Sequence, residues 1–402
     1  MVTGWKKAKI GELTDIVNGG TPSTAIAEYW NGGINWCTPS DITKKKTKYL
    51  SNTEKTITEK GLSESSASLL PIGTILLCSR ATIGEMSIAA SEMATNQGFK
   101  NLICKKDVDN EFLYYALFPL RNKMLELAIG TTFLEISKSA LQSIEVIIPA
   151  DIIEQTAIAE ALSDIDSLIS SLQKLIEKEK AIKQGAMQEL LTGKKRLPGF
   201  SEEWSKQQLG DICNIVNGGT PSTSIAEFWN GKILWCTPTD ITSCSTKYIY
   251  TTESKITESG LKASSATLLP KGALLLCSRA TIGEVRIAGN TICTNQGFKS
   301  LVVHQNISNE WLYYMVHVLK FNMLEKAIGS TFLEISKKDL AELDIIVPEF
   351  TEQKAIAQVL SDMDSEIELL EKKLAKYQQI KQGMMQELLT GRIRLKEGEN
   401  NV

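Results

Sequence analysis

The feature that most constrains this chain is an internal duplication with a period near 200 residues. Trp5 recurs as Trp204, an offset of 199 that holds through Pro149 and Pro348 and becomes 198 afterwards. Both copies contain the same blocks almost letter for letter: NGGTPST, LLCSRATIGE, TNQGFK and FLEISK. Solenoid repeats are only about 20–50 residues long. The period therefore indicates two copies of one globular domain, each followed by a second, elongated segment.

That second segment has the pattern of a long amphipathic helix. Residues 151–193 contain no proline, and apolar residues recur at intervals of four and three, as in a coiled-coil seam: Ile158, Leu162, Ile165, Ile169, Leu172 and Ile176. The second copy repeats the seam at Ile356, Leu360, Met363, Ile367, Leu370 and Leu374. About 40 helical residues span ~60 Å, more than the width of a small domain. We expect Asp151 and Glu154 to form a capping box and Gly193 to end the first helix.

Each globular copy has a mixed pattern, and we predict a mixed α/β (α+β) class. Short strand-like runs are bounded by turn residues, at 34–38, 74–78, 86–89, 99–104 and 144–148. A helix is expected over 110–128, bent near Pro119, and a short helix begins near Ser137. The predicted organisation is a domain (1–150), a spacer helix (151–193), a linker and second domain (194–349), a second spacer helix (350–391) and a tail (392–402).

Composition excludes several classes of protein. No run of about 18 apolar residues exists and the N-terminus has no signal-peptide pattern, so we expect a cytoplasmic protein without a membrane partner. The eight cysteines contain no Cys-x-x-Cys, and only His304 and His317 are histidines, so no metal site is expected. Cys37 and Cys78 recur as Cys236 and Cys277, which indicates buried, reduced thiols. The net charge of −3 argues against indiscriminate nucleic-acid binding.

The duplication also argues against catalysis, because a site within each domain should appear in both copies. His304 aligns with Lys105 and His317 with Phe118, so no histidine-based triad is duplicated. The chain has neither a Walker loop nor G-x-G-x-x-G. The carboxylates that both copies share are interpreted as solvated or ion-paired rather than as a nuclease site: Asp41/Asp240, Glu54/Glu253, Glu85/Glu284 and Glu135/Glu334.

Both copies share polar loop residues of the types that contact DNA. Arg80 and Arg279 follow a predicted strand, where a guanidinium can reach guanine O6 and N7, and Asn–Gln pairs can bond adenine N6 and N7. For Arg80 an ion pair with a carboxylate such as Glu85 is an equally good interpretation, and for Asn96 so is a turn cap. The full set of candidate DNA contacts is Thr38, Ser40, Lys44, Lys45, Lys46, Arg80, Thr82, Asn96, Gln97, Lys100, Thr237, Thr239, Arg279, Thr281, Asn295, Gln296 and Lys299.

Some candidates are not shared, and others are better explained by structure. The second copy has Ser243–Ser245 in place of Lys44–Lys46, so these lysines cannot have a base-recognition role that both copies share. They are interpreted either as phosphate contacts or as part of a solvated loop. The tryptophans of both copies are expected to anchor the core or loops: Trp30, Trp36, Trp229 and Trp235.

A glycine lies inside each predicted long helix, where it costs about 1 kcal/mol relative to alanine. Because MQELL continues the helical pattern, a kink or early helix end is the less favoured explanation. Close approach of another helix or of a partner is favoured instead, and the candidate partner-binding residues are Gly185, Gln188, Gly383 and Gln386.

Together these motifs resemble the specificity subunit of type I restriction–modification systems over nearly the whole chain. The resemblance rests on the Trp5 and Trp204 starts, the NGGTPST and NQGFK blocks, and the entry to each long helix. Its strongest part is LLTGKKRLPGF at 190–200, echoed by LLTGRIRL at 388–395.

The resemblance implies two target recognition domains, each recognising half of a bipartite site in double-stranded DNA. It also implies two long helices that pair antiparallel with a pseudo-two-fold relation. Two methyltransferase subunits, which carry S-adenosylmethionine and methylate adenine N6, would dock on them. Restriction subunits using ATP and Mg would join the full complex. The chain itself would be non-catalytic and have no cofactor.

The near-identity of the two domains adds its own inference. We expect nearly identical, inverted half-sites, because two-fold proteins match palindromic sites. The alternatives are a stand-alone metal-dependent nuclease and a coiled-coil scaffold that binds no DNA.

Overall fold

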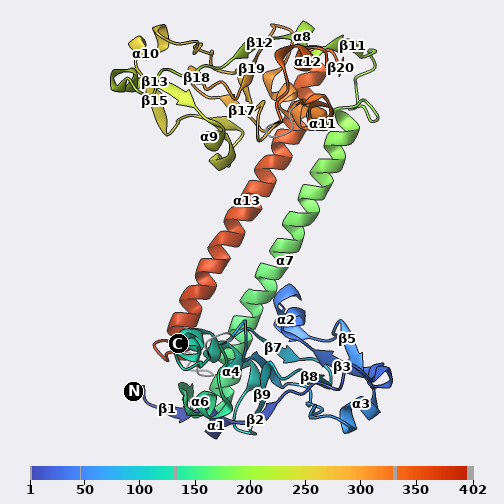
Figure 1. The fold of residues 1–402 in the computed structure, drawn as a ribbon, viewed down its shortest axis with the longest axis vertical. Helices are drawn as coiled ribbons and strands as arrows, with labels where there is room; N and C mark the ends of the chain where they lie inside the picture. Colours follow the sequence, from blue (N-terminus) through green and yellow to red (C-terminus); the bar gives the residue numbers. More distant parts are fainter. Residues whose placement is uncertain (1, 46, 131–133, 329–332, 396–402) are drawn as a thin grey trace, which may run out of the picture. The chain divides into compact units, whose positions relative to one another are not determined.

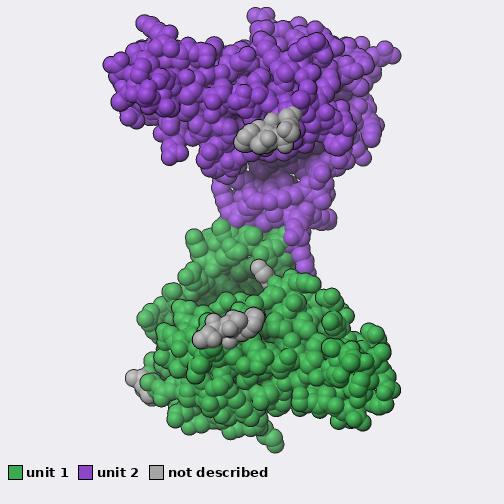
Figure 2. Space-filling model, viewed as in Figure 1, with its two compact units in different colours: residues 1–173, 373–402 green, residues 174–372 purple. Residues whose placement is uncertain are grey.

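The chain is described from a computed structural model that covers residues 2–45, 47–130, 134–328 and 333–395. It divides into two compact units, residues 1–173 with 373–402 and residues 174–372 (Figure 2). Each unit contains one globular domain and parts of both long helices, α7 (Ile152–Leu190) and α13 (Phe350–Leu388) (Figure 1). The two long helices predicted from the seam pattern are therefore present. The five-segment division of the chain stays a prediction.

The first domain contains short strands and helices. Its described strands are β1 (Trp5–Lys9), β2 (Thr14–Asn18), β3 (Trp30–Cys37), β4 (Tyr49–Leu50), β5 (Lys55–Ile57), β6 (Ile75–Cys78), β7 (Met86–Ala89), β8 (Met93–Thr95), β9 (Phe99–Cys104) and β10 (Glu145–Pro149). Its described helices are α1 (Ile10–Leu13), η1 (Ala27–Tyr29), α2 (Pro39–Lys45), α3 (Glu59–Ser63), α4 (Asn110–Leu117), η2 (Phe118–Leu120), α5 (Arg121–Glu126) and α6 (Lys138–Ser143).

These strands form sheets with the orders β2-β9-β6-β7-β4, β5-β3-β8 and β1-β10. Most neighbours are antiparallel, while β3–β8 and β4–β7 are parallel. The predicted mixed class is confirmed.

The second domain repeats this topology. Its described strands are β11 (Ser205–Gln208), β12 (Cys213–Asn217), β13 (Trp229–Cys236), β14 (Tyr248–Ile249), β15 (Ser254–Ile256), β16 (Leu274–Leu276), β17 (Val285–Ala288), β18 (Ile292–Thr294), β19 (Lys299–Val303) and β20 (Asp344–Val347). Its described helices are α8 (Leu209–Ile212), η3 (Ala226–Phe228), α9 (Pro238–Ser243), α10 (Glu258–Lys262), α11 (Asn309–Lys326) and α12 (Lys337–Ala341). The sheet orders are β12-β19-β16-β17-β14, β15-β13-β18 and β11-β20, which match those of the first domain element for element.

Pro119 accounts for the main difference between the copies. The helix predicted over 110–128 is broken into α4, η2 and α5, with the break at Pro119. The second copy has Val318 at this position, and its helix α11 runs unbroken. Proline removes a backbone donor and clashes with the preceding turn, so the break has a local cause.

Each domain shares its hydrophobic core with the long helices of its own unit. In the first unit, Ile158 and Leu162 of α7 and Leu388 of α13 are buried in one cluster with Phe112 and Tyr115 of α4. In the second unit the equivalent cluster joins Leu190, Ile356 and Leu360 to α11. Fully burying such side chains stabilises a fold by about 1.5–3 kcal/mol each. The long helices are therefore integral to both cores.

Within each unit, α7 and α13 run antiparallel. In the second unit Lys180 Nζ lies 2.6 Å from Glu371 Oε1, and Lys183 pairs with Asp364, so numbers rise along one helix as they fall along the other. In the first unit Lys381 Nζ lies 2.6 Å from Asp166 Oδ1. The antiparallel pairing that the family resemblance implied is confirmed within each unit.

The expected start of the first long helix is half right. Asp151 Oδ1 accepts a hydrogen bond from Ile153 N at 3.0 Å, as a capping residue should. Glu154 does not complete the box, because its buried carboxylate accepts the guanidinium of Arg394, with Nη2 2.6 Å from Oε2. At the other end, α7 stops at Leu190 and Gly193 has a φ of +71°, as expected for a C-terminal stop.

Across the described ranges, we find no helix with the length and apolarity needed to span a membrane.

Candidate nucleic-acid interface

Two of the duplicated blocks meet backbone to backbone. Gly20 N donates to Thr95 O at 2.8 Å, and a Cβ on Gly19 would lie 1.8 Å from Asn96 O. No side chain fits in that space, which explains the glycine in NGGTPST. Trp36 Nε1 donates to Gly20 O at 2.9 Å, and this hydrogen bond helps to hold the NGGTPST block in place. The second domain repeats the arrangement, with 1.8 Å from a Cβ on Gly218 to Asn295 O.

Two further blocks join the same place. Ser79 N, in the turn after β6, donates to Gly98 O at 2.7 Å, and Asn96 N donates to Cys37 O at 3.0 Å. We call the resulting surface the loop cluster, made of residues 18–24, 37–41, 79–85 and 95–98 in the first domain and 217–223, 236–240, 278–284 and 294–297 in the second. Motifs that are distant in the sequence are therefore brought together, and this happens in both domains.

A charged triad supports the loop cluster. Arg80 Nε lies 2.7 Å from Glu135 Oε2, and Lys100 Nζ lies 3.0 Å from Glu135 Oε1. The alternative that Arg80 pairs with Glu85 is wrong, because Glu85 pairs with Arg121 at 2.7 Å. The predicted ion pair exists, but with a carboxylate farther along the chain.

The second domain contains the same triad. Arg279 Nε lies 2.8 Å from Glu334 Oε2, and Lys299 Nζ lies 3.2 Å from Glu334 Oε1. In both domains, burial acts to raise the pKa of the shared carboxyl, but the arginine and lysine outweigh it and hold the pKa below its ordinary value of 4.5. Each carboxylate is therefore ionised at neutral pH.

The arginine and the lysine of the triad differ in exposure. The Arg80 side chain is 44% exposed, whereas that of Lys100 is 8% exposed. Of the three guanidinium nitrogens of Arg80, only Nε contacts Glu135, and the two terminal nitrogens have no hydrogen bond to any described residue. Arg196 is different, because its Nε and Nη2 both bind Glu352, at 2.6 and 2.7 Å. The ion pair therefore orients the Arg80 side chain and leaves both terminal guanidinium nitrogens available for another contact.

The backbone next to this arginine is strained in both copies. Ala81 has a φ of +53° and Ala280 a φ of +49°, in the left-handed region that residues other than glycine rarely adopt. Ile136 N donates to Ser79 O at 3.0 Å and Arg80 bridges to Glu135, which holds the turn in place. Such conformations cluster at binding sites, where surrounding contacts maintain them.

The amide candidates divide into a turn former and an exposed group. Asn96 Oδ1 accepts from Gly98 N at 2.9 Å, so the turn-cap interpretation of Asn96 is confirmed. Gln97 is exposed, and its Oε1 accepts a hydrogen bond from Thr21. Asn295 and Gln296 repeat both contacts.

The hydroxyl candidates divide in the same way. Thr38 Oγ1 donates to Asp41 Oδ2 at 2.7 Å and Thr237 to Asp240 at 2.7 Å, whereas Ser40 and Thr239 are exposed. The hydroxyl oxygens of Thr82 and Thr281 are buried, without a hydrogen-bond partner in the described part of the chain.

The lysine candidates also have different surroundings. Lys44 Nζ lies 3.3 Å from Glu54 Oε2 in an exposed pair, and Lys45 Nζ donates to Asn52 O at 2.6 Å. Lys46 lies outside the described residues. Lys100 and Lys299 are buried against their glutamates, so they act in positioning rather than at the surface.

The expectations for the tryptophans and the shared cysteines are confirmed. Trp30 and Trp36 pack edge to face with centroids 4.9 Å apart, as anchors of the loop and core. Cys37, Cys78, Cys236 and Cys277 are buried free thiols, and burial raises the pKa of Cys78 to about 12. The shared carboxylates are ion-paired or hydrogen-bonded, as in the Asp41 contact to Glu54 N at 2.8 Å, except that of Glu253, which is exposed. No cluster of three metal-ligating residues occurs among the residues that the structure describes.

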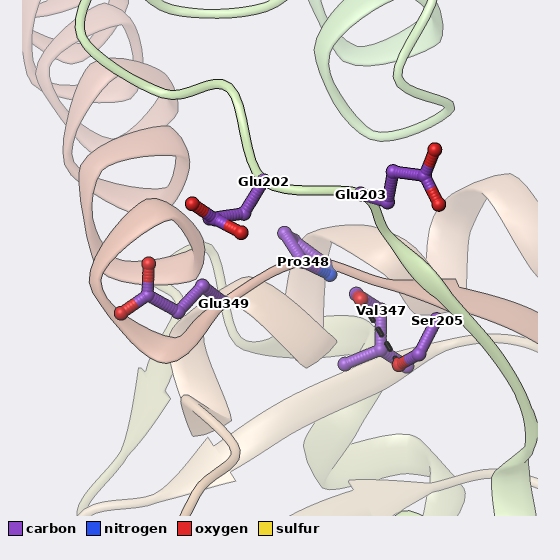
Figure 3. Close-up of a pocket in the computed structure, with 6 residues that line it drawn as sticks. All are labelled: Glu202, Glu203, Ser205, Val347, Pro348 and Glu349. Carbon is purple, nitrogen blue, oxygen red and sulfur yellow. Dashed lines mark hydrogen bonds between the residues drawn. The ribbon is translucent and has the colours of Figure 1, made fainter.

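An acidic groove of about 490 Å³ lies beside the start of α13 (Figure 3). It is lined by Glu202, Glu203, Ser205, Val347, Pro348 and Glu349. The first two glutamates align with Thr3 and Gly4 of the first domain, so this groove is not a shared feature. Its negative charge disfavours phosphate, and it is not part of the candidate DNA surface.

Comparison with known proteins decides the family. The family described as the type I restriction modification DNA specificity domain matches this chain twice, over residues 3–181 and 201–380. The chain belongs to this family. Its two specificity domains are non-catalytic, and they supply DNA recognition to a restriction–modification system. The stand-alone nuclease and the scaffold without DNA binding are not supported.

One related protein matches this chain over nearly its full length, and another matches less than half of it. The MjaIX specificity subunit of Methanocaldococcus jannaschii is 27% identical over 413 residues, which cover 98% of this chain and 94% of that protein. The EcoR124I/EcoR124II specificity subunit of Escherichia coli is 31% identical over 170 residues, 40% of this chain and 41% of that protein. The fold is similar to that of a crystal structure of the S subunit from M. genitalium, with a TM-score of 0.59, 19% identity and 96% of each chain covered.

The glycines of the long helices do not serve helix–helix packing inside the chain. A Cβ on Gly185 or Gly383 would meet nothing within 4 Å among the described residues. Of the two explanations expected for these glycines, close approach of another helix is wrong for the described part of the chain, and approach of a partner stays a prediction. The helices continue past both glycines. Gln188 and Gln386 are also exposed, and Ile182 and Ile380 nearby are 44% and 39% exposed. These faces of the specificity subunit are open to a partner.

Sequence reasoning missed the partners that orient the candidate residues. Glu135 was recognised only as a shared carboxylate, and its FLEISK block was the available signal. The link from Glu154 to Arg394, repeated from Glu352 to Arg196, was also missed. Both members of each link occur in the duplicated motifs, which marks them as shared residues but does not indicate which acid pairs with which base.

Proposed function

We propose that each specificity domain recognises one half of an interrupted, near-palindromic site in double-stranded DNA, with the two half-sites inverted. The observation that carries this proposal is the repetition of the loop cluster and its triad, contact for contact, in both domains. Identical side chains held by identical contacts favour the same bases. Two different half-sites would need different recognition groups.

The proposed base contacts are those that are both shared and exposed. Arg80 and Arg279 bind guanine through their terminal nitrogens, and Gln97 and Gln296 contact bases next to it. Ser40 and Thr239 contact phosphate, and so do Lys44 and Lys45, which occur in the first domain alone. Thr38, Thr82, Lys100 and their counterparts Thr237, Thr281 and Lys299 maintain the loop cluster instead, and Asn96 and Asn295 form its turns.

The inversion of the half-sites follows from how each domain is attached. The first domain packs against the beginning of α7 and the end of α13, and the second against the beginning of α13 and the end of α7. The attachments are the same with the two helices exchanged, and the helices are antiparallel in each unit. Equivalent domains on exchanged antiparallel helices favour a two-fold arrangement, which matches an inverted site.

Two methyltransferase subunits dock on the long helices in this proposal, at the exposed face formed by Ile182, Gly185 and Gln188 and its copy Ile380, Gly383 and Gln386. A glycine beside an exposed isoleucine lets an apolar side chain of the partner approach the helix backbone. The methyltransferase subunits bring S-adenosylmethionine and methylate adenine N6, and restriction subunits with ATP and Mg join the complete assembly.

The test compares Arg80→Ala with Arg279→Ala in the complex co-expressed with its methyltransferase. A bidentate arginine–guanine contact contributes about 1–3 kcal/mol of discrimination. Each variant should therefore relax base preference by roughly tenfold in its own half-site, and leave the other half-site unchanged. Methylated adenines are mapped by sequencing. The control is Lys123→Ala in α5, whose lysine pairs with Glu126 alone among the residues that the structure describes. Unchanged preference in both half-sites, or loss of folding by circular dichroism, would contradict the proposed contacts.

A further inference from the structure

We propose that a polar network joining each domain to both long helices determines which gap between the two half-sites is accepted. The proposal rests on the proposed function, because it presupposes two half-sites recognised together. It assigns a specificity role to residues that do not touch DNA. They are positioning residues, which act through the orientation of the domain.

In the first unit the network connects Lys48, which precedes β4, and helix α4 to α7 and α13. Lys48 Nζ lies 2.5 Å from Glu111 Oε2 and donates to Ser163 Oγ at 2.6 Å. Tyr115 OH donates to Asp166 Oδ2 at 2.7 Å. Asp166 also pairs with Lys381 of α13 at 2.6 Å. One domain helix is thus tied to both long helices.

The second unit repeats the network with the long helices exchanged. Lys247 Nζ donates to Ser361 Oγ at 2.9 Å and lies 3.5 Å from Glu310 Oε1. Tyr314 OH donates to Asp364 Oδ2 at 2.6 Å, and Asp364 pairs with Lys183. Both units therefore have polar contacts between the domain and the long helices at a place that apolar side chains could also fill. Unlike apolar packing, hydrogen bonds and ion pairs depend on direction.

The network lies at the edge of an open groove. In the first unit this groove has a volume of about 1070 Å³ and includes Lys48, Glu111, Ser163, Asp166 and Lys381 in its lining. At this level the domain is held to α7 by the buried cluster, through Tyr115 and Leu162, and also by the polar contacts of the network, which have a fixed direction. Removing a contact there leaves room for the domain to tilt.

Gln155 provides a second attachment of the first domain to α7, and together with the network it fixes the orientation of the domain relative to this helix. Gln155 in the first turn of α7 is fully buried and donates to Pro149 O at 3.0 Å. Asp166 lies 11 residues further along the helix, about 16 Å at the α-helical rise. One anchor permits rocking about a point, whereas two anchors separated along the helix axis fix the tilt.

A small tilt of the domain relative to the long helices is enough to change which gap between the half-sites is accepted. A domain of this size has a radius of gyration of about 15 Å, so its far side lies ~30 Å from the helix that carries it. One base-pair step is about 3.4 Å. A tilt of only about 6–7° therefore shifts the recognition loops by one base pair.

The experiment measures methylation of DNA with fixed half-sites and a gap varied in single base-pair steps, by the complex of the full chain with its methyltransferase. For the unaltered chain, gaps one base pair too short or too long should be methylated at least about tenfold more slowly, because they misplace a whole half-site. Tyr115→Phe and Asp166→Asn each remove one contact and keep the side-chain shape. A typical hydrogen bond corresponds to about fivefold in an equilibrium, so the penalty for the adjacent gap should fall by about fivefold.

Tyr314→Phe in the second unit should have the same effect, and base preference within each half-site should not change. Glu371→Gln is the matched control. The Lys180–Glu371 pair joins the two long helices, and neither side chain has a hydrogen bond or ion pair with a domain residue in the described part of the chain. An unchanged gap profile in Tyr115→Phe and Asp166→Asn overturns the inference. A change in base preference with an unchanged gap profile overturns it as well. Failure of the unaltered chain to support methylation at any gap would instead refute the proposed function.

Discussion

The buried amide of Gln155 makes a sharp prediction about stability. Gln155 Oε1 accepts from Asp109 N at 2.9 Å, and Nε2 donates to Pro149 O at 3.0 Å and to Asp107 O at 3.3 Å. Gln155→Leu retains the volume but leaves three backbone groups without partners. At about 1 kcal/mol per hydrogen bond, the free energy of unfolding of the first unit should fall by about 3 kcal/mol. For a unit of about 200 residues this lowers Tm by about 6–12 °C.

Differential scanning calorimetry of the full chain measures this shift, and the duplication provides internal controls. Gln353 makes the equivalent contacts in the second unit, at 2.8, 2.9 and 3.3 Å, so Gln353→Leu should lower the transition of that unit by a similar amount. Gln173→Leu alters an exposed position of α7 and should change stability by no more than about 0.5 kcal/mol. A Tm for Gln155→Leu within about 2 °C of the unaltered chain would refute the reasoning.

Three further predictions concern docking, acid stability and catalysis. Gly185→Ala and Gly383→Ala should each stabilise the chain by about 1 kcal/mol, since the added Cβ meets nothing in the described chain, while weakening co-purification of the methyltransferase. Retention of the methyltransferase at unaltered levels would contradict the docking face. The lowered pKa values of Glu135 and Glu334 mean that the unfolded chain takes up protons first as pH falls. Their contribution is present above pH 4.5 and is lost below it, so the urea midpoint should decrease there, and Glu135→Gln with Glu334→Gln should flatten the decrease. The purified chain alone should neither cleave nor methylate DNA, and either activity with no partner present would restore the enzyme hypothesis.

Much of the fold could be predicted because its signals are local or repeated. The heptad seam identified both long helices, and the offset of 199 identified the duplicated domains. Five strands of the first domain were missed: β1, β2, β4, β5 and β8. Strands β4, β5 and β8 are two or three residues long, too short for a periodic pattern, whereas β1 and β2 have five residues each. Pro119 predicted a bend, and the structure has a full break there, with η2 between α4 and α5.

The candidate site was predicted less completely, because its geometry depends on residues far apart in the chain. Arg80 is 55 residues from Glu135, and Glu154 is 240 residues from Arg394. No local pattern distinguishes these acids from others, so Glu85 was as good a partner for Arg80 as Glu135. The open space around Gly185 likewise depends on which face α13 covers. Residue types were therefore predictable, whereas their pairings needed the fold.

The central claim is that two equivalent domains recognise equivalent, inverted half-sites. Its most direct test is to co-express this chain with its methyltransferase subunit and map methylated adenines across a genome. The account predicts one interrupted motif whose two halves are inverted copies or nearly so, with a single gap length. Two unrelated half-sites would contradict it.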